Sequence, residues 1–180
     1  PNASLMQVAD TALHSKDDVI VLMGGTNDTL NQDFTSIYTY LEQTLVELCK
    51  DRVVIISTIP RRFDLDCMNQ IHNEVVLVNN YIRELVTRYK YVHLIDLDLL
   101  QRFHFTQHGL HFSNRGKTKM AHLITNKLKD IYLNDKRHKV GLATAKPNTR
   151  NNKLKILKTH MSKVIEQHKD DKKVGFAHSV

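Results

Sequence analysis

The polar residues with the clearest catalytic chemistry follow the first long apolar run of the chain. Residues Val19–Met23 are apolar without interruption, and Gly24–Gly25 then allow the backbone to turn where a side chain would clash. Thr26–Asp28 come next, and the side-chain amide of Asn27 is a hydrogen-bond donor of the kind that stabilises an oxyanion. This pattern predicts a polar site at the end of a buried strand.

A second polar segment, His108–His111, precedes the last predicted helix of the domain. The imidazole of His111 is suited to act as a general base at neutral pH. An amide donor at Asn27 and an imidazole base at His111 together fit acyl transfer, which also requires a hydroxyl nucleophile.

These groups can meet only if the chain folds as an alternating α/β domain. Unbroken apolar runs predict strands buried on both faces, and apolar spacing of three to four residues predicts helices. The expected strands are 19–23, 53–57 and 91–95, and the expected helices are 4–14, 34–50, 70–89 and 115–133. The alternation predicts a parallel sheet covered on both faces, with Asn27 and His111 sharing a cleft at its carboxyl edge.

Length and composition favour one ordinary domain with an appendage. The 180 residues contain no apolar run long enough to cross a membrane, and the first ten residues lack the pattern of a signal peptide. Cys49 and Cys67 are unclustered, which is typical of free thiols in a reducing compartment. These features predict an intracellular protein without a membrane partner.

The charge divides the chain into two parts. Residues 1–135 contain 14 Lys and Arg against 16 Asp and Glu, whereas residues 136–180 contain 12 against 3, so the net charges are −2 and +9. We therefore expect a domain over 1–135, followed by a basic linker and a partly helical tail. The tail could be solvated, could dock on the domain, or could contact a polyanion such as nucleic acid.

The two polar segments resemble the sequence blocks of the SGNH (GDSL-type) hydrolase family. The resemblance covers roughly residues 1–133. Within this range the chain is similar in detail to esterase-like domains of insect genomes and retroelement proteins. It implies a flavodoxin-like three-layer sandwich. The family's GxND block falls on Gly25–Asp28, so Asn27 would donate to the oxyanion, with Gly25 and Asp28 supporting the loop. The DxxH block falls on His108–His111, so His111 would be the base.

The chain departs from the family pattern at two positions. The Gly-Asp-Ser block that carries the serine nucleophile is absent from residues 1–180, and its strand would pair beside Val19–Met23. The Asp of the DxxH block is His108, which leaves His108, Asp96 or Asp98 as possible partners that orient His111. Without the upstream strand, Val19–Met23 should lie at a sheet edge that is either exposed or covered by the tail or a partner chain.

The resemblance implies a Ser–His hydrolase acting on a small acyl or acetyl ester, with no cofactor. As given, the chain would be incomplete or inactive because the nucleophile is missing. The alternative is a non-catalytic esterase-like scaffold whose residues 136–180 bind nucleic acid.

Simpler roles remain open for several of these residues. Asn27 and Asp28 could serve only in turn chemistry, and Gly109 is expected to supply a backbone turn. The spacing of His104, His108 and His111 also allows a zinc site, although no carboxylate lies within that cluster. Further candidates are Ser57 as a substitute nucleophile, more simply a strand-end hydroxyl, and Arg61 and Arg62 at the cleft mouth, more simply in a solvated loop.

Overall fold

A computed structural model describes residues 3–31 and 34–140. The chain falls into two compact units, Pro1–Lys127 and the chain from Leu128 onward. The predicted division into a domain (1–135) and a tail (136–180) stays a prediction, because from residue 141 the tail lies outside the described residues. The fold described below is that of the first unit.

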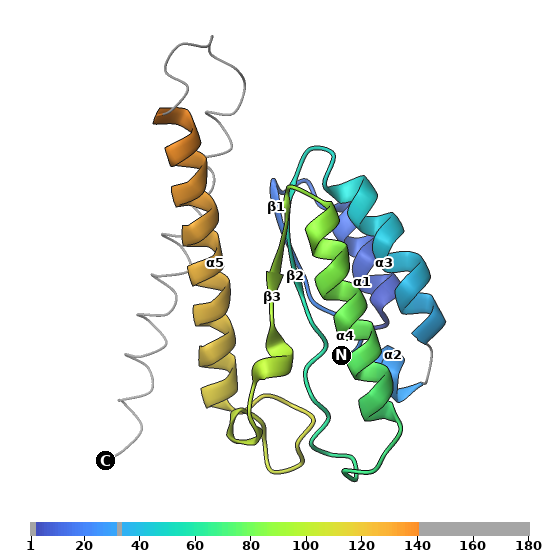
Figure 1. The fold of residues 1–180 in the computed structure, drawn as a ribbon. Helices are drawn as coiled ribbons and strands as arrows, with labels where there is room; N and C mark the ends of the chain where they lie inside the picture. The colour runs from blue at the N-terminus through green and yellow to red at the C-terminus, as the bar shows by residue number, and fades with distance from the viewer. Residues whose placement is uncertain (1–2, 32–33, 141–180) are drawn as a thin grey trace, which may run out of the picture. The chain divides into compact units, whose positions relative to one another are not determined.

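Helices and strands alternate as predicted (Figure 1). The elements are α1 (Leu5–His14), β1 (Val19–Leu22), α2 (Thr26–Leu30), α3 (Phe34–Leu48), β2 (Val53–Ser57), α4 (Ile71–Arg88), β3 (Val92–Ile95), the 3₁₀ turns η1 (Leu97–Leu99) and η2 (Arg102–His104), and α5 (Asn114–Val140). The predicted α/β class is confirmed. The short helix α2 and the two 3₁₀ turns are additions to the predicted set.

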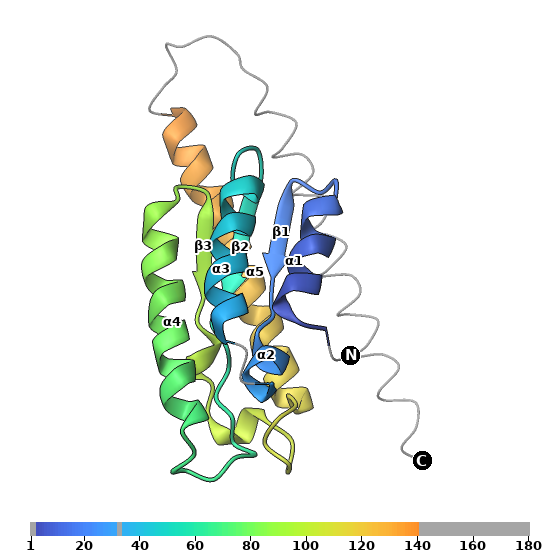
Figure 2. The same cartoon turned by 90° about the vertical axis from the view of Figure 1, so that its right-hand side faces the viewer.

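The strands form a parallel sheet in the order β1-β2-β3. Helices α1, α3 and α4 lie together on one side of the sheet, and the part of α5 up to Lys127 lies on the other (Figures 1 and 2). The core fills the space between the sheet and the three helices. Its most buried members are Leu22, Leu41, Leu45, Val54, Val78 and Leu85.

The prediction that Val19–Met23 is buried on both faces is wrong on one of them. Ile20 and Leu22 face the helices and are buried, whereas Val21 on the other face is 39% exposed. Val21 points away from α1, α3 and α4. Because β1 is an edge strand with a neighbouring strand on one side only, fewer side chains surround Val21 than would surround it in the middle of the sheet. Among the described residues, β1 therefore presents a free outer edge, which is one of the outcomes predicted for Val19–Met23.

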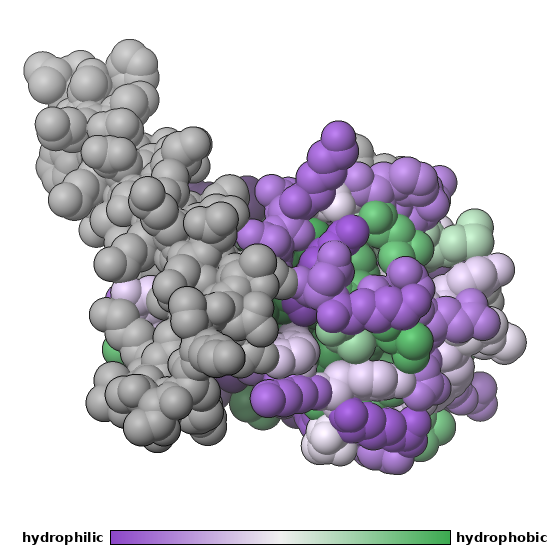
Figure 3. All heavy atoms as spheres, turned by 90° about the horizontal axis from the view of Figure 1, so that it is seen from above, coloured by the Kyte–Doolittle hydropathy of each residue, from purple (hydrophilic) through white to green (hydrophobic). Residues whose placement is uncertain are grey.

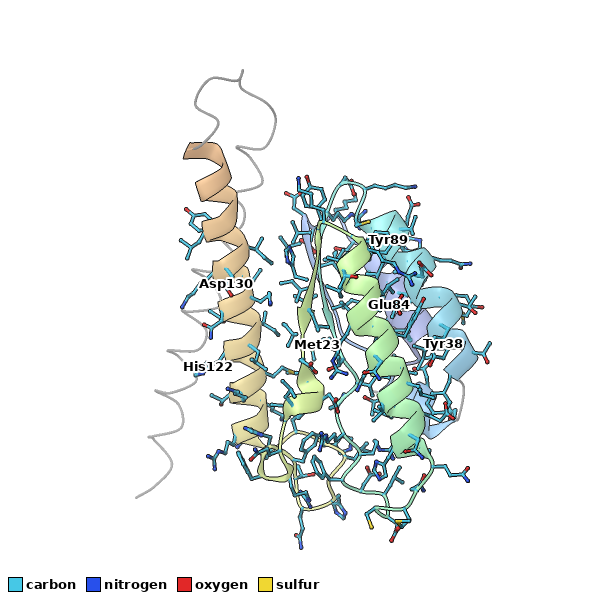
Figure 4. The ribbon with its side chains drawn as sticks, viewed as in Figure 1. Met23, Tyr38, Glu84, Tyr89, His122 and Asp130 are labelled. Carbon is cyan, nitrogen blue, oxygen red and sulfur yellow. The ribbon has the colours of Figure 1, made fainter. Side chains whose placement is uncertain are left out.

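Polar groups cluster where α3 meets α4. The Tyr81 hydroxyl donates to the Tyr38 carbonyl at 3.3 Å and to Glu42 at 3.2 Å, and the Tyr89 hydroxyl donates to Glu42 at 3.3 Å. Figure 4 shows Tyr38 and Tyr89 in this region. Burial, and then the Glu42 charge, raise the pKa of Tyr81 from 10.0 to about 12.

This raised pKa predicts a loss of stability in alkali. Because the folded protein holds the Tyr81 proton more tightly than the unfolded chain, the contribution of Tyr81 is complete below pH 10 and is lost as the pH rises toward about 12. Urea unfolding between pH 9 and 12 should show this decline, and Tyr81→Phe should flatten it. Tyr40→Phe, at a half-exposed tyrosine of α3, is the matched control. Equal slopes for the two variants would contradict the assignment.

Candidate active site

The segment after β1 is shaped by Gly25. Its φ of 96° lies in the left-handed region, and it is the residue at the amino end of α2. A Cβ added there would come within 2.8 Å of the Ile59 Cδ1, so the turn also requires the absence of a side chain. The predicted loop-supporting role of Gly25 thus has a steric basis: it lets the chain pass directly from β1 into the helix that carries Asn27.

Asn27 and Asp28 connect this segment to the start of α1. Both carboxylate oxygens of the buried Asp28 accept from the Leu5 backbone N–H, at 2.9 and 3.1 Å, and the Asn27 amide donates to the Ala3 carbonyl at 2.9 Å. Ser4 is the N-cap of α1 and forms a capping box with Gln7. Asp28 therefore braces the loop, and one N–H of the Asn27 amide already has a partner.

The loop that carries His111 is held by its backbone. The Thr106 N–H donates to the His111 carbonyl at 2.8 Å, and Phe105 pairs with Phe112 in an isolated bridge, with their rings 5.1 Å apart. The His111 residue is exposed, and its imidazole makes no hydrogen bond or ion pair to any described residue. The imidazole is thus available on a fixed backbone.

Helix α5 closes this loop at its far end. Ser113 is the N-cap of this helix, since its Oγ accepts from the Gly116 N–H at 3.2 Å. A Cβ on Gly116 would lie 1.9 Å from the His104 carbonyl oxygen. The backbone of the first turn of α5 therefore packs so closely against the backbone at His104 that no side chain fits between them.

The loop between β2 and α4 joins the two predicted catalytic segments. The Arg62 guanidinium makes a bidentate pair with Asp64, at 2.6 and 2.7 Å, and also donates to the Thr29 hydroxyl of α2 at 3.5 Å. On the other side, Gly109 packs so tightly on this loop that an added Cβ would come within 2.5 Å of the Phe63 carbonyl. The Arg62 hydrogen bonds lower the pKa of Asp64.

A second charged cluster lies just beyond β3. Arg83 donates to both oxygens of Asp96 at 3.0 Å and to Asp98 at 2.8 Å, and the Thr58 hydroxyl donates to Asp96 at 2.9 Å. The hydrogen bonds that Arg83 donates to Asp96 and Asp98 raise the pKa of its guanidinium. Both oxygens of Asp96 are thus engaged by groups other than His111.

The structure brings the predicted catalytic segments to one edge of the sheet. Helix α2 and the loop before α5 both lie at the end where the strands finish (Figures 1 and 2), and the contacts of Arg62 and Gly109 connect them. The opposite end, viewed in Figure 3, has a mainly hydrophilic described surface. No described bond joins His111 to Asn27, His108 or Asp96, so the roles of the four side chains stay proposals.

The other candidates have different positions. Ser57 is buried, next to a cavity of only 10 Å³ under Gly24 and Gly25. Within residues 3–31 and 34–140, no three His, Cys, Asp or Glu side chains are grouped to hold a metal ion. In the same residues, no helix has the length and apolar character of a membrane span.

The expectation of a solvated Arg62 is wrong, because this residue is 2% exposed. Pairing with Asp64 permits its burial, while its neighbour Arg61 remains exposed. Sequence reasoning also missed Thr29 and Arg83 as parts of this region. The alternating charges of Arg62 and Asp64 were the one available signal, and such spacing is common in exposed loops.

Comparison with known proteins agrees with this geometry. The family model described as GDSL-like Lipase/Acylhydrolase matches residues 3–124. No curated protein matches the chain. The family match spans the three strands, both polar segments and the loop that joins them. The chain therefore belongs to the GDSL-like lipase/acylhydrolase family, whose α/β fold it has.

Proposed function

We propose that this chain supplies the base and the oxyanion donor of a Ser–His ester hydrolase acting on small acyl or acetyl esters. The observation that supports this proposal most directly is that Arg62 and Gly109 connect the helix that carries Asn27 to the loop that carries His111, at one edge of the sheet. His111 would take the proton of a serine hydroxyl as that oxygen attacks the ester carbonyl. It would then pass the proton to the departing alcohol, and water would release the acyl group.

Asn27 would stabilise the negative oxygen of the tetrahedral intermediate. Its amide has two N–H groups, and one donates to the Ala3 carbonyl. Asp96 would have to leave Arg83 and Thr58 to orient His111, so the proposal depends on Asn27 and His111 rather than on Asp96 or His108.

The serine would be supplied from outside residues 1–180 by a strand that pairs with the free edge of β1. An open groove of 820 Å³ runs along this edge, between β1 and α1. Loss of the serine costs about 2 × 10⁶ in kcat in a comparable triad, against about 3 × 10⁴ for the Asp. The proposal thus predicts negligible hydrolysis by residues 1–180 alone.

Labelling by a fluorophosphonate probe tests this proposal. In the parent polypeptide that contains the upstream sequence, we expect one labelled serine, and His111→Gln should slow labelling by about 10²- to 10⁴-fold. His14→Gln, at an exposed histidine of α1, is the matched control. A parent protein in which no serine is labelled would exclude the hydrolase.

A second candidate follows from the charge distribution. The net charge of +9 in residues 136–180 favours nucleic-acid binding by the tail of a non-catalytic scaffold. Unchanged RNA binding after neutralising the lysines of 153–173 in the full chain would exclude a binding role for the tail.

A further inference from the structure

An open hollow of 820 Å³ lies between the 3₁₀ turns after β3 and the first half of α5. Figure 1 shows these turns beside the start of α5. Neither Asn27 nor His111 lines the hollow. It is therefore a separate feature from the groove along β1 and from the proposed base and donor.

The α5 wall of this hollow is positively charged. Arg115 and Lys119 supply this charge, and His122, which is labelled in Figure 4, lines the same wall; all three residues are exposed. Residues 114–127 contain no Asp or Glu. Among the described residues that line the hollow, Asp96 supplies the one carboxylate, and Arg83 neutralises it. The hollow thus favours an anionic ligand.

The opposite wall presents an aromatic ring to solvent. Phe103 is 48% exposed, and the Arg115 guanidinium lies 4.4 Å from the centroid of its ring. The His104 ring packs beside it at 4.2 Å. Exposed aromatic rings next to cations are the platforms on which proteins stack the bases of single strands, since every base has a π-face.

We propose that this hollow binds single-stranded nucleic acid: a base takes the place of the Arg115 guanidinium on the Phe103 ring, and the released Arg115, together with Lys119, binds backbone phosphates. A ligand of opposite charge suits this wall better than the chain's own residues 136–180, which carry a net charge of +9. A concave site of this volume suits a nucleotide, whereas a helix that lies on a bilayer presents a broad apolar face. The proposal does not depend on the hydrolase activity.

Fluorescence anisotropy with a labelled twenty-residue oligothymidylate tests the proposal in the full chain. Phe103→Leu should weaken binding about 5- to 100-fold because it removes stacking while keeping an apolar contact, and Phe103→Tyr should restore binding. The double variant Arg115→Ala, Lys119→Ala should reduce the salt slope of log K by about 1.4, at about 0.7 per phosphate. Lys16→Ala, at an exposed lysine before β1, is the matched control.

Photo-crosslinking with a bromodeoxyuridine-substituted strand separates this site from the tail. We expect crosslinked peptides from residues 99–123. Crosslinks confined to residues 136–180, or equal affinities of Phe103→Leu and the unmodified chain, would overturn the proposal. Binding of the chain to phosphatidylserine vesicles that persists in Phe103→Leu, without oligonucleotide binding, would instead assign the surface to membranes.

Discussion

Replacing Asp64 with asparagine is expected to lower the free energy of unfolding by about 3–5 kcal/mol. The Arg62 side chain is 1% exposed, so removal of the carboxylate leaves a cation without solvent or a charged partner. Arg62→Met should cost less, because the remaining Asp64 carboxylate is 20% exposed and can be hydrated. This asymmetry distinguishes a buried cation from an ordinary surface pair.

Urea unfolding of the two single variants and of the double variant measures this effect. The double variant should recover part of the loss, since it leaves neither charge alone. Glu47→Gln removes a carboxylate from the exposed pair with Lys50 and should change stability by less than about 1 kcal/mol. Equal costs for Asp64→Asn and Glu47→Gln would show that Arg62 is not buried in solution.

Replacing Gly109 with alanine is expected to cost about 2–5 kcal/mol. Its φ of 86° is unfavourable for any residue with a Cβ, by about 1–2 kcal/mol. The added carbon would also lie 2.5 Å from the Phe63 carbonyl and 2.7 Å from the Asp64 nitrogen. The Arg62–Asp64 ion pair holds these backbone atoms in place, so they cannot move aside as a flexible side chain can. The steric clash should therefore destabilise the fold by about 1–3 kcal/mol more.

The same unfolding measurement checks this prediction, and proton NMR of the His111 ring reports whether the loop moves. Gly24→Ala is the control, because its Cβ would meet the flexible end of Leu5 at 3.0 Å, without a positive φ. We expect Gly24→Ala to cost less than about 1 kcal/mol and to leave the His111 resonance in place. A stable Gly109→Ala variant with an unshifted resonance would contradict the tight contact with Phe63.

The sequence predicts elements whose signal is local. The strand Val53–Ser57 has the predicted bounds, and the spacing of Val75, Val78, Ile82 and Leu85 identifies the buried side of α4. Helix α2 has five residues, too few for a periodic pattern. The exposure of Val21 depends on the position of β1 at the edge of the sheet. That position is set by pairing between strands far apart in the sequence, which no local pattern encodes.

For the candidate site, too, the sequence predicts the local features but not the contacts between distant segments. Strand ends and the turn at Gly24–Gly25 suffice to place Asn27 and His111 at one edge of a parallel sheet. The bonds that join their segments could not be predicted, because the burial of Arg62 depends on its contact with α2. Such contacts form only after both loops have folded.

The contact between Gly116 and the His104 carbonyl links the first turn of α5 to the loop that carries His111, the proposed base. If a ligand on α5 tilts its first turn, the backbone at His104 has no space to remain where it is. That displacement would continue along the loop to the imidazole of His111. Binding of a ligand to the helix and binding of an ester beside the imidazole would then be coupled thermodynamically, each changing the affinity of the other by the same factor.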